Sequence, residues 1–137
     1  MDYQSLKKSE VKELSGLLET KLQSLEQEIR DFERELTDDK NQDEQSAADA
    51  VDRSSFEEGI QRLQLVLNEK VKLKNEVRAA LERVADGSYG FCEESEEPIG
   101  FSRLKAQPWT RYSLEAQVER ENRIRQRAAG RSPSEFY

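Results

Sequence analysis

Large apolar residues recur at steps of three and four along two long stretches of the chain. In the first stretch, residues 5–36, they stand at Val11, Leu14, Leu18, Leu22, Leu25, Ile29, Phe32 and Leu36. This stretch contains no proline, and Gly16 is its only glycine. Glutamate, lysine and arginine fill the positions between, so the apolar stripe is narrow, as in the a/d seam of a coiled coil. The spacing predicts one long amphipathic helix.

Residues 37–53, TDDKNQDEQSAADAVDR, interrupt the stripe, because they include almost no large apolar side chain. We interpret them as the turn between two helices. The helical period returns at Phe56, Ile60, Leu63, Leu67, Val77, Leu81 and Val84. Ser54 with Glu57, and Ser55 with Glu58, form two overlapping capping boxes at or just inside the first turn of this second helix. Gly87 can adopt the left-handed conformation that follows a helix, so we expect the helix to stop near Asp86.

Two stripes of about thirty residues joined by a polar turn predict an antiparallel coiled-coil hairpin over residues 1–86, roughly 45 Å long. Each helix would bury the stripe of the other, since neither is stable alone. A fragment of a larger helical bundle would show the same pattern of apolar residues. The narrow stripe favours the hairpin, because a helix surrounded by neighbours carries a wider apolar face.

The composition changes from residue 87 onward, where the only tryptophan and four of the six glycines lie. Residues 87–137 are predicted to form a small irregular globule of turns with a short hairpin, followed by a helix over residues 112–129 and a frayed tail, RSPSEFY. The expected core of the globule is aromatic and aliphatic: Tyr89, Phe91, Ile99, Phe101, Leu104 and Trp109. The fold class is therefore mainly α.

Composition excludes several kinds of chemistry. Only 34% of the 137 residues are hydrophobic and 37% are charged, which suits an elongated helical protein better than a rounded domain. The chain has no histidine, and Cys92 is its only cysteine. A Ser-His-Asp or Cys-His nucleophile, a histidine-ligated metal, an intramolecular disulfide and a four-cysteine zinc site are all excluded. No acid/base constellation is visible, so an enzyme is the least favoured class.

Charge and hydropathy bear on partners and location. No apolar run has the length of a membrane span, and the N-terminus lacks the apolar region of a secretory signal, so a cytoplasmic protein is expected. A formal net charge of −7 disfavours general binding to nucleic acid.

Residues 38–58 hold eight acidic and two basic side chains, whereas residues 103–131 hold eight basic and three acidic ones. The acidic segment is either a solvated loop or a surface for a basic channel or a partner's Mg²⁺. The basic segment either complements a helix macrodipole or contacts phosphate or an acidic protein.

Two motifs at a fixed distance resemble those of the DksA/TraR family. The segment DAVDRS at residues 49–54 is similar to the D-x-x-D-x-A hairpin tip of that family. GSYGFC at 87–92 and EPIGFSRLKAQP at 97–108 resemble its globule motif, and forty residues separate Asp52 from Cys92, as in DksA-type members. At the level of motifs the resemblance covers roughly residues 49–125.

The resemblance implies a regulator of transcription that binds bacterial RNA polymerase directly, as a monomer and without DNA contact. Its coiled coil would enter the secondary channel of the polymerase, and tip aspartates near the catalytic centre would alter the stability of promoter open complexes. By this resemblance Asp49 and Asp52 are the effector carboxylates, with Asp52 the more important, and Arg53 and Ser54 belong to the same tip surface. Ser54 replaces the alanine of the family, a departure that bears on the strength of the tip contact and not on its location.

The chain departs from the family at the zinc site. The four cysteines of the family pattern fall here at Cys92, Ser95, Ser113 and Ala116. One thiolate, two hydroxyls and a methyl group cannot hold Zn²⁺ tetrahedrally, because structural sites use four strong nitrogen or sulfur ligands. We therefore expect no zinc, no other metal and no cofactor. An aromatic cluster around Trp109 would hold the globule instead, with Cys92 as a packed thiol and not a redox switch.

A second departure concerns ppGpp, the alarmone of the stringent response. The family's site for it at the polymerase interface uses basic residues, and those positions correspond here to Glu76, Gln107 and Gln117. Phosphates are bound through lysine or arginine, so weak or absent ppGpp dependence is expected.

Two rival functions stay open. One is a structural or adaptor coiled coil that no longer acts on polymerase. The other is a Gre-like transcript-cleavage factor whose tip acids hold a second Mg²⁺. The retained aspartates Asp49 and Asp52 count against the first rival, and the DksA-like globule counts against the second.

Overall fold

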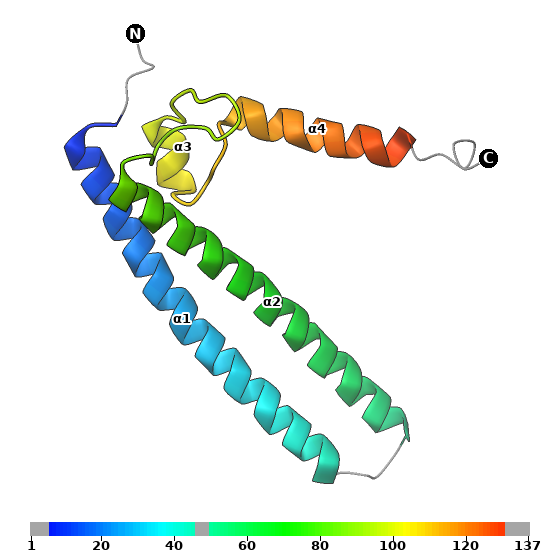
Figure 1. Ribbon diagram of the computed structural model, residues 1–137. Coiled ribbons are helices and arrows are strands. Elements are labelled where there is room, and N and C mark those ends of the chain that lie inside the picture. Colours follow the sequence, from blue (N-terminus) through cyan, green and yellow to red (C-terminus); the bar gives the residue numbers. More distant parts are fainter. Residues whose placement is uncertain (1–5, 46–49, 131–137) are drawn as a thin grey trace. The chain divides into compact units, whose positions relative to one another are not determined.

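The computed structural model describes residues 6–45 and 50–130, with only the backbone described for residues 40–45 and 50–52. It contains four helices (Figure 1): α1 (Lys8–Gln45), α2 (Ala50–Asp86), α3 (Phe101–Ala106) and α4 (Leu114–Gly130). The predicted frayed tail at 131–137 and Asp49 lie outside the described residues. The chain divides into two compact units, one formed by residues 18–79 and the other by residues up to 17 together with those from 80 onward.

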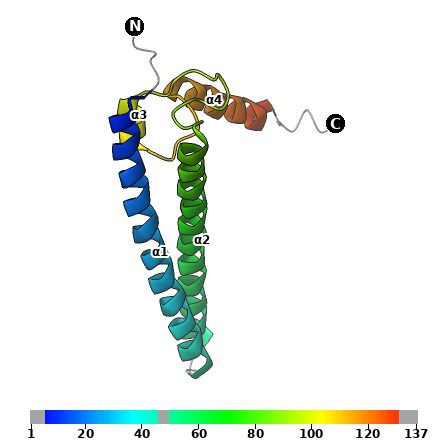
Figure 2. The same ribbon diagram turned by 60° about the vertical axis from the view of Figure 1, so that its left-hand side comes forward.

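The unit of residues 18–79 is a helical hairpin in which α1 and α2 run side by side in opposite directions (Figures 1 and 2). Its core contains Ile29, Leu36 and Leu67, with the partly buried Phe32, Ile60 and Leu63 packed against them. Leu18, Leu25 and Val77 are also buried, each with at most 1% of its surface exposed. All of these residues stand at the predicted seam positions, so the helical hairpin is confirmed.

Charged side chains bridge the two helices beside the seam. The Lys70 ammonium lies 2.9 Å from the Glu28 carboxylate and 5.4 Å from the centre of the Phe32 ring. Arg78 lies 3.5 Å from Glu26. The hydrogen bond from Lys70 is the main cause that lowers the pKa of Glu28 below its usual value. Pairs of this kind flank a coiled-coil seam and favour one register of the two helices.

The predicted turn at 37–53 is wrong over most of its length. α1 continues to Gln45, and α2 already begins at Ala50. The segment contains neither glycine nor proline, and its glutamate, glutamine, lysine and alanine residues form helix readily, so the loss of the apolar stripe did not mark the helix end. The capping boxes that start at Ser54 and Ser55 consequently lie inside α2, where both serines are exposed, and do not begin the helix.

The end of α2 agrees with the prediction. Gly87 has a φ of 86°, in the left-handed region, and the Ser88 N–H donates to the Arg83 carbonyl at 3.0 Å. This bond spans six residues and closes the helix as in a Schellman motif. The Asp86 carboxylate also accepts from the Ser88 hydroxyl at 2.6 Å and from its N–H at 2.9 Å.

The other unit contains α3, α4 and a short hairpin. A single antiparallel bridge joins Phe91 and Pro98, and it is the only strand-like pairing in the described ranges. α4 begins at Leu114, two residues later than predicted. No described helix has both the length and the apolar content needed to span a membrane.

The core of this unit is smaller in side-chain volume than the sequence suggested. The buried residues here include Tyr89, Cys92, Leu104, Thr110 and Ala116. Phe91, predicted to be in the core, is 39% exposed, and Ile99, Phe101 and Trp109 are only half-buried. Few residues surround each large ring in so small a unit, so rings at its surface keep one side in water.

Candidate functional site

The hairpin tip carries the first candidate site, which the structure describes in part. Asp52 lies in the first turn of α2, which begins at Ala50, and only its backbone is described. An acidic residue is favoured there, because the N-terminus of a helix carries a partial positive charge. Arg53 and Ser54 follow on the same helix, and both are exposed. With Asp49 outside the described residues, the pairing of the two aspartates stays a prediction.

The second candidate site is the set of four positions that the family pattern assigns to zinc. The Ser95 N–H donates to the Cys92 sulfur at 3.5 Å, and the Ser95 hydroxyl and the Ser113 backbone lie near enough to that sulfur to lower the pKa of the thiol. Ala116 is buried in the first turn of α4, where its N–H donates to the Ser113 hydroxyl at 3.2 Å. The structure therefore brings Cys92, Ser95 and Ser113 together, with Ala116 bonded to the last of them.

Ser113 has a local role that the sequence analysis missed. It directly precedes α4, and its hydroxyl accepts from the N–H of the third residue of that helix, Ala116. A serine in this position is an N-cap, which satisfies one of the unpaired N–H groups at a helix start. The signal in the sequence is a serine placed directly before a helical segment.

The four positions do not provide the donors of a structural zinc centre. Such a centre uses four nitrogen or sulfur ligands, and here one thiol stands with two hydroxyls and a methyl group. Across the described part of the chain, no group of three or more histidine, cysteine, aspartate or glutamate side chains could hold a metal ion. The donor set therefore does not fit the metal.

Cys92 is a buried thiol with unusual acidity. Its surface is 1% exposed, and burial by itself raises the pKa of the thiol. Hydrogen bonds from the Ser95 hydroxyl and from the backbone N–H groups of Ser95, Ser113 and Glu94 stabilise the thiolate and together lower its pKa to about 7. The sulfur thus keeps an environment suited to a negative charge.

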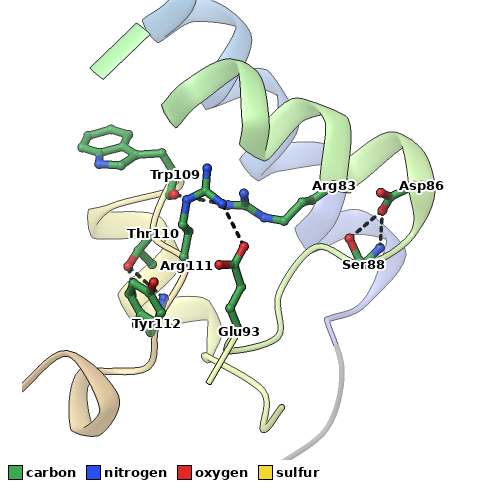
Figure 3. A network of polar contacts seen from close by, with 8 residues as sticks. All are labelled: Arg83, Asp86, Ser88, Glu93, Trp109, Thr110, Arg111 and Tyr112. Carbon is green, nitrogen blue, oxygen red and sulfur yellow. Dashed lines mark hydrogen bonds and ion pairs between the residues drawn. The ribbon is translucent and has the colours of Figure 1, made fainter. Parts of the chain in front are cut away.

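Polar contacts join separate segments of this unit, and Figure 3 draws several of them. The Arg111 guanidinium donates to the Glu93 carboxylate at 2.9 Å, and the Glu93 N–H donates to the Arg111 carbonyl at 2.9 Å. Arg83 donates to the Trp109 carbonyl at 3.2 Å, and Arg103 to the Tyr112 carbonyl at 2.9 Å. These contacts join segments more than five residues apart in sequence.

The aromatic cluster expected around Trp109 stays a prediction beside these polar contacts. Trp109 takes part through its backbone carbonyl, and its ring is only half-buried. Tyr89 is the aromatic residue that is buried, and its hydroxyl donates to the Pro108 carbonyl at 2.7 Å. Burial raises the pKa of Tyr89 to about 12, so this donor stays protonated at neutral pH.

The three positions matched to the ppGpp site are placed as follows. Glu76 is a half-buried residue of α2. Gln107 is exposed at the C-terminal end of α3, and the Gln117 amide donates to Glu121 at 3.0 Å on α4. None of the three side chains is a cation, so none can replace the lysine or arginine that a phosphate needs.

The thiolate site predicts a pH dependence of stability. The pKa of Cys92 is about 7 in the fold against 9.0 for an ordinary thiol, so the folded state favours the thiolate. The free energy of unfolding should therefore rise between pH 7 and 9, by about 3 kcal/mol at most, and this gain should disappear as pH falls through 7. Urea unfolding at several pH values measures it. Cys92→Ala should remove the rise, and equal pH slopes in both proteins would contradict the assignment.

Comparison with known proteins places this fold and these motifs in a family. Residues 87–122 match the model of the prokaryotic dksA/traR C4-type zinc finger. The RNA polymerase-binding transcription factor DksA of Caulobacter vibrioides is 41% identical over 105 residues, which cover 77% of this chain and 74% of that protein. General stress protein 16O of Bacillus subtilis is 29% identical over 118 residues, covering 78% and 72%. The structure of transcription factor DksA2 from Pseudomonas aeruginosa matches with a TM-score of 0.74 at 33% identity, covering 86% of this chain and 88% of that one. The chain therefore belongs to the DksA/TraR family.

Proposed function

We propose that this chain is a non-enzymatic regulator of transcription that binds bacterial RNA polymerase directly. The observation that carries the proposal is its 41% identity, over 77% of its length, to a protein named as an RNA polymerase-binding transcription factor. Bacterial RNA polymerase works in the cytoplasm, so the proposal places the chain there. The chain would act as a monomer and without DNA contact, in keeping with its net charge of −7.

The length of the hairpin supports a mechanism in which its tip is the acting part. α1 and α2 have 38 and 37 residues, so each extends roughly 55 Å. Their seam is buried, and many charged side chains lie on the remaining surface, beside exposed apolar residues such as Leu65 and Val66. In this proposal the hairpin enters the secondary channel, docked through the globule and the hairpin sides. Asp49 and Asp52 would then alter open-complex stability through their charge near the catalytic centre.

The variant Asp52→Asn tests the role of the tip. The amide has nearly the shape of the carboxylate but no charge, so binding to RNA polymerase in a pull-down should stay within about twofold of wild type. The effect on open-complex lifetime in transcription in vitro should be lost.

Asp38→Asn is the matched control, since Asp38 lies in the same acidic segment but on α1. It should bind and regulate like wild type. Full activity of Asp52→Asn would contradict the tip mechanism. Failure of the wild-type chain to bind polymerase would favour an adaptor protein, and shortening of stalled transcripts would favour a Gre-like cleavage factor.

We also propose that ppGpp has little influence on this regulator. Glu76 would repel a phosphate, and Gln107 and Gln117 offer only neutral amides. Transcription from a ribosomal RNA promoter, measured at the half-saturating concentration of the chain, should change by less than about twofold when ppGpp is added. Strong synergy between the chain and ppGpp would contradict this.

The globule is proposed to work without zinc, because three of the four ligand positions lack a thiolate. Protein purified from zinc-supplemented cells should contain far less than one equivalent of the metal. A chelator should leave both its thermal unfolding and its binding to polymerase unchanged. One equivalent of tightly held zinc per chain would overturn the proposal.

A further inference from the structure

We infer that ion pairs between residues 93–94 and residues 111–123 close the globule at the place where a zinc finger would be closed by metal. The inference rests on the zinc independence proposed above and adds the interaction that replaces the metal. A zinc centre would join the loop at 92–95 to the segment at 113–116. In this chain charged side chains join the two parts of the sequence around these positions: Glu93 and Glu94 directly follow Cys92, and their arginine partners lie on either side of residues 113–116.

The first connection links Glu93, the residue after Cys92, to Arg111, two residues before Ser113. It has two hydrogen bonds that point in opposite directions, one from the Arg111 guanidinium to the Glu93 carboxylate and one from the Glu93 N–H to the Arg111 carbonyl, each 2.9 Å long. Figure 3 shows the two side chains directed toward one another. The backbone bond fixes the distance between the segments, so the ion pair loses less conformational entropy than a pair of free surface chains would.

The second connection links Glu94 to α4. Its carboxylate lies 2.5 Å from the Arg123 guanidinium and 3.6 Å from that of Arg120. The Arg120 guanidinium also lies 4.4 Å from the centre of the Tyr112 ring, which restricts its position. Arg120 and Arg123 are three residues apart and share one face of the helix. Glu94 thus joins the loop to two turns of α4.

Each ion pair alone is weak, because its side chains are about one third to one half exposed and water screens them. Acting together on two short segments, they hold the loop against the start of α4. A closure of this kind weakens when salt screens the charges and is insensitive to a chelator.

Amide hydrogen exchange of the intact chain tests the closure. Arg111→Met keeps the apolar stem and removes the guanidinium, so exchange in residues 91–99 should accelerate about three- to tenfold while exchange in α2 stays unchanged. The charge swap Glu93→Arg with Arg111→Glu should restore exchange to within about twofold of wild type. In the wild-type chain, raising salt from about 0.1 M to about 1 M should accelerate exchange in the same residues.

Arg125→Met is the control, since Arg125 is an exposed arginine on α4, and it should exchange like wild type. A variant Arg111→Met that exchanges like wild type would overturn the inference. If that variant unfolds the globule, recovery in the charge swap supports the inference and continued unfolding contradicts it. The zinc content of the protein is measured separately. If the chain holds zinc and is insensitive to Arg111→Met, the zinc proposal has failed. If the chain is free of zinc and still insensitive to Arg111→Met, the zinc proposal stands and the ion-pair inference has failed.

Discussion

The narrow apolar seam between α1 and α2 is the interaction on which the rest of the structure depends. Ile29 and Leu36 of α1 pack with Leu67 of α2, and residues of this seam are among the most buried in the chain. Because each helix buries only one stripe, a chain with 37% charged residues can still fold, and every other face stays available for water or a partner. α1 continues to Gln45 and α2 starts at Ala50, so both described arms of the acidic segment are helical.

Features with a local physical cause were predictable from the sequence. The seam follows from periodicity, and the end of α2 follows from the freedom of Gly87 to adopt a positive φ of 86°. The prediction of a turn at 37–53 was wrong because an apolar stripe indicates that a helix packs against another element. Its absence does not show that the segment is not helical. Its glutamates, glutamines and alanines form a helix well enough without glycine or proline to stop it.

The globule was harder to predict because its contacts are not local. Arg111 and Glu93 are eighteen residues apart, and nothing in a chain rich in both charges marks these two as partners. The hydrophobicity of Phe91 predicted a place in the core, but its side chain is 39% exposed. The smaller Cys92 and Ala116 are buried instead. The family motif located the four ligand positions, but only the geometry shows Ser113 to be the N-cap of α4. In the family motif this position is a cysteine ligand that is absent here, whereas the hydrogen bond of Ser113 shows that it caps the start of α4.

Loss of three cysteines and retention of one lead to a consistent physical account of the globule. A metal centre gathers negative thiolates, and backbone N–H groups directed at the sulfurs stabilise that charge. Without a metal the remaining N–H groups still point at Cys92, which explains a thiol pKa of about 7 in a buried site. Serine at 113 suits the helix start, because its hydroxyl accepts an N–H that the first turn of α4 leaves unpaired. Alanine at 116 fills the small buried space in the first turn of the same helix. In the proposed zinc-free globule, several weak bonds take the place of the strong bonds of a metal, so charge and solvent would set its stability.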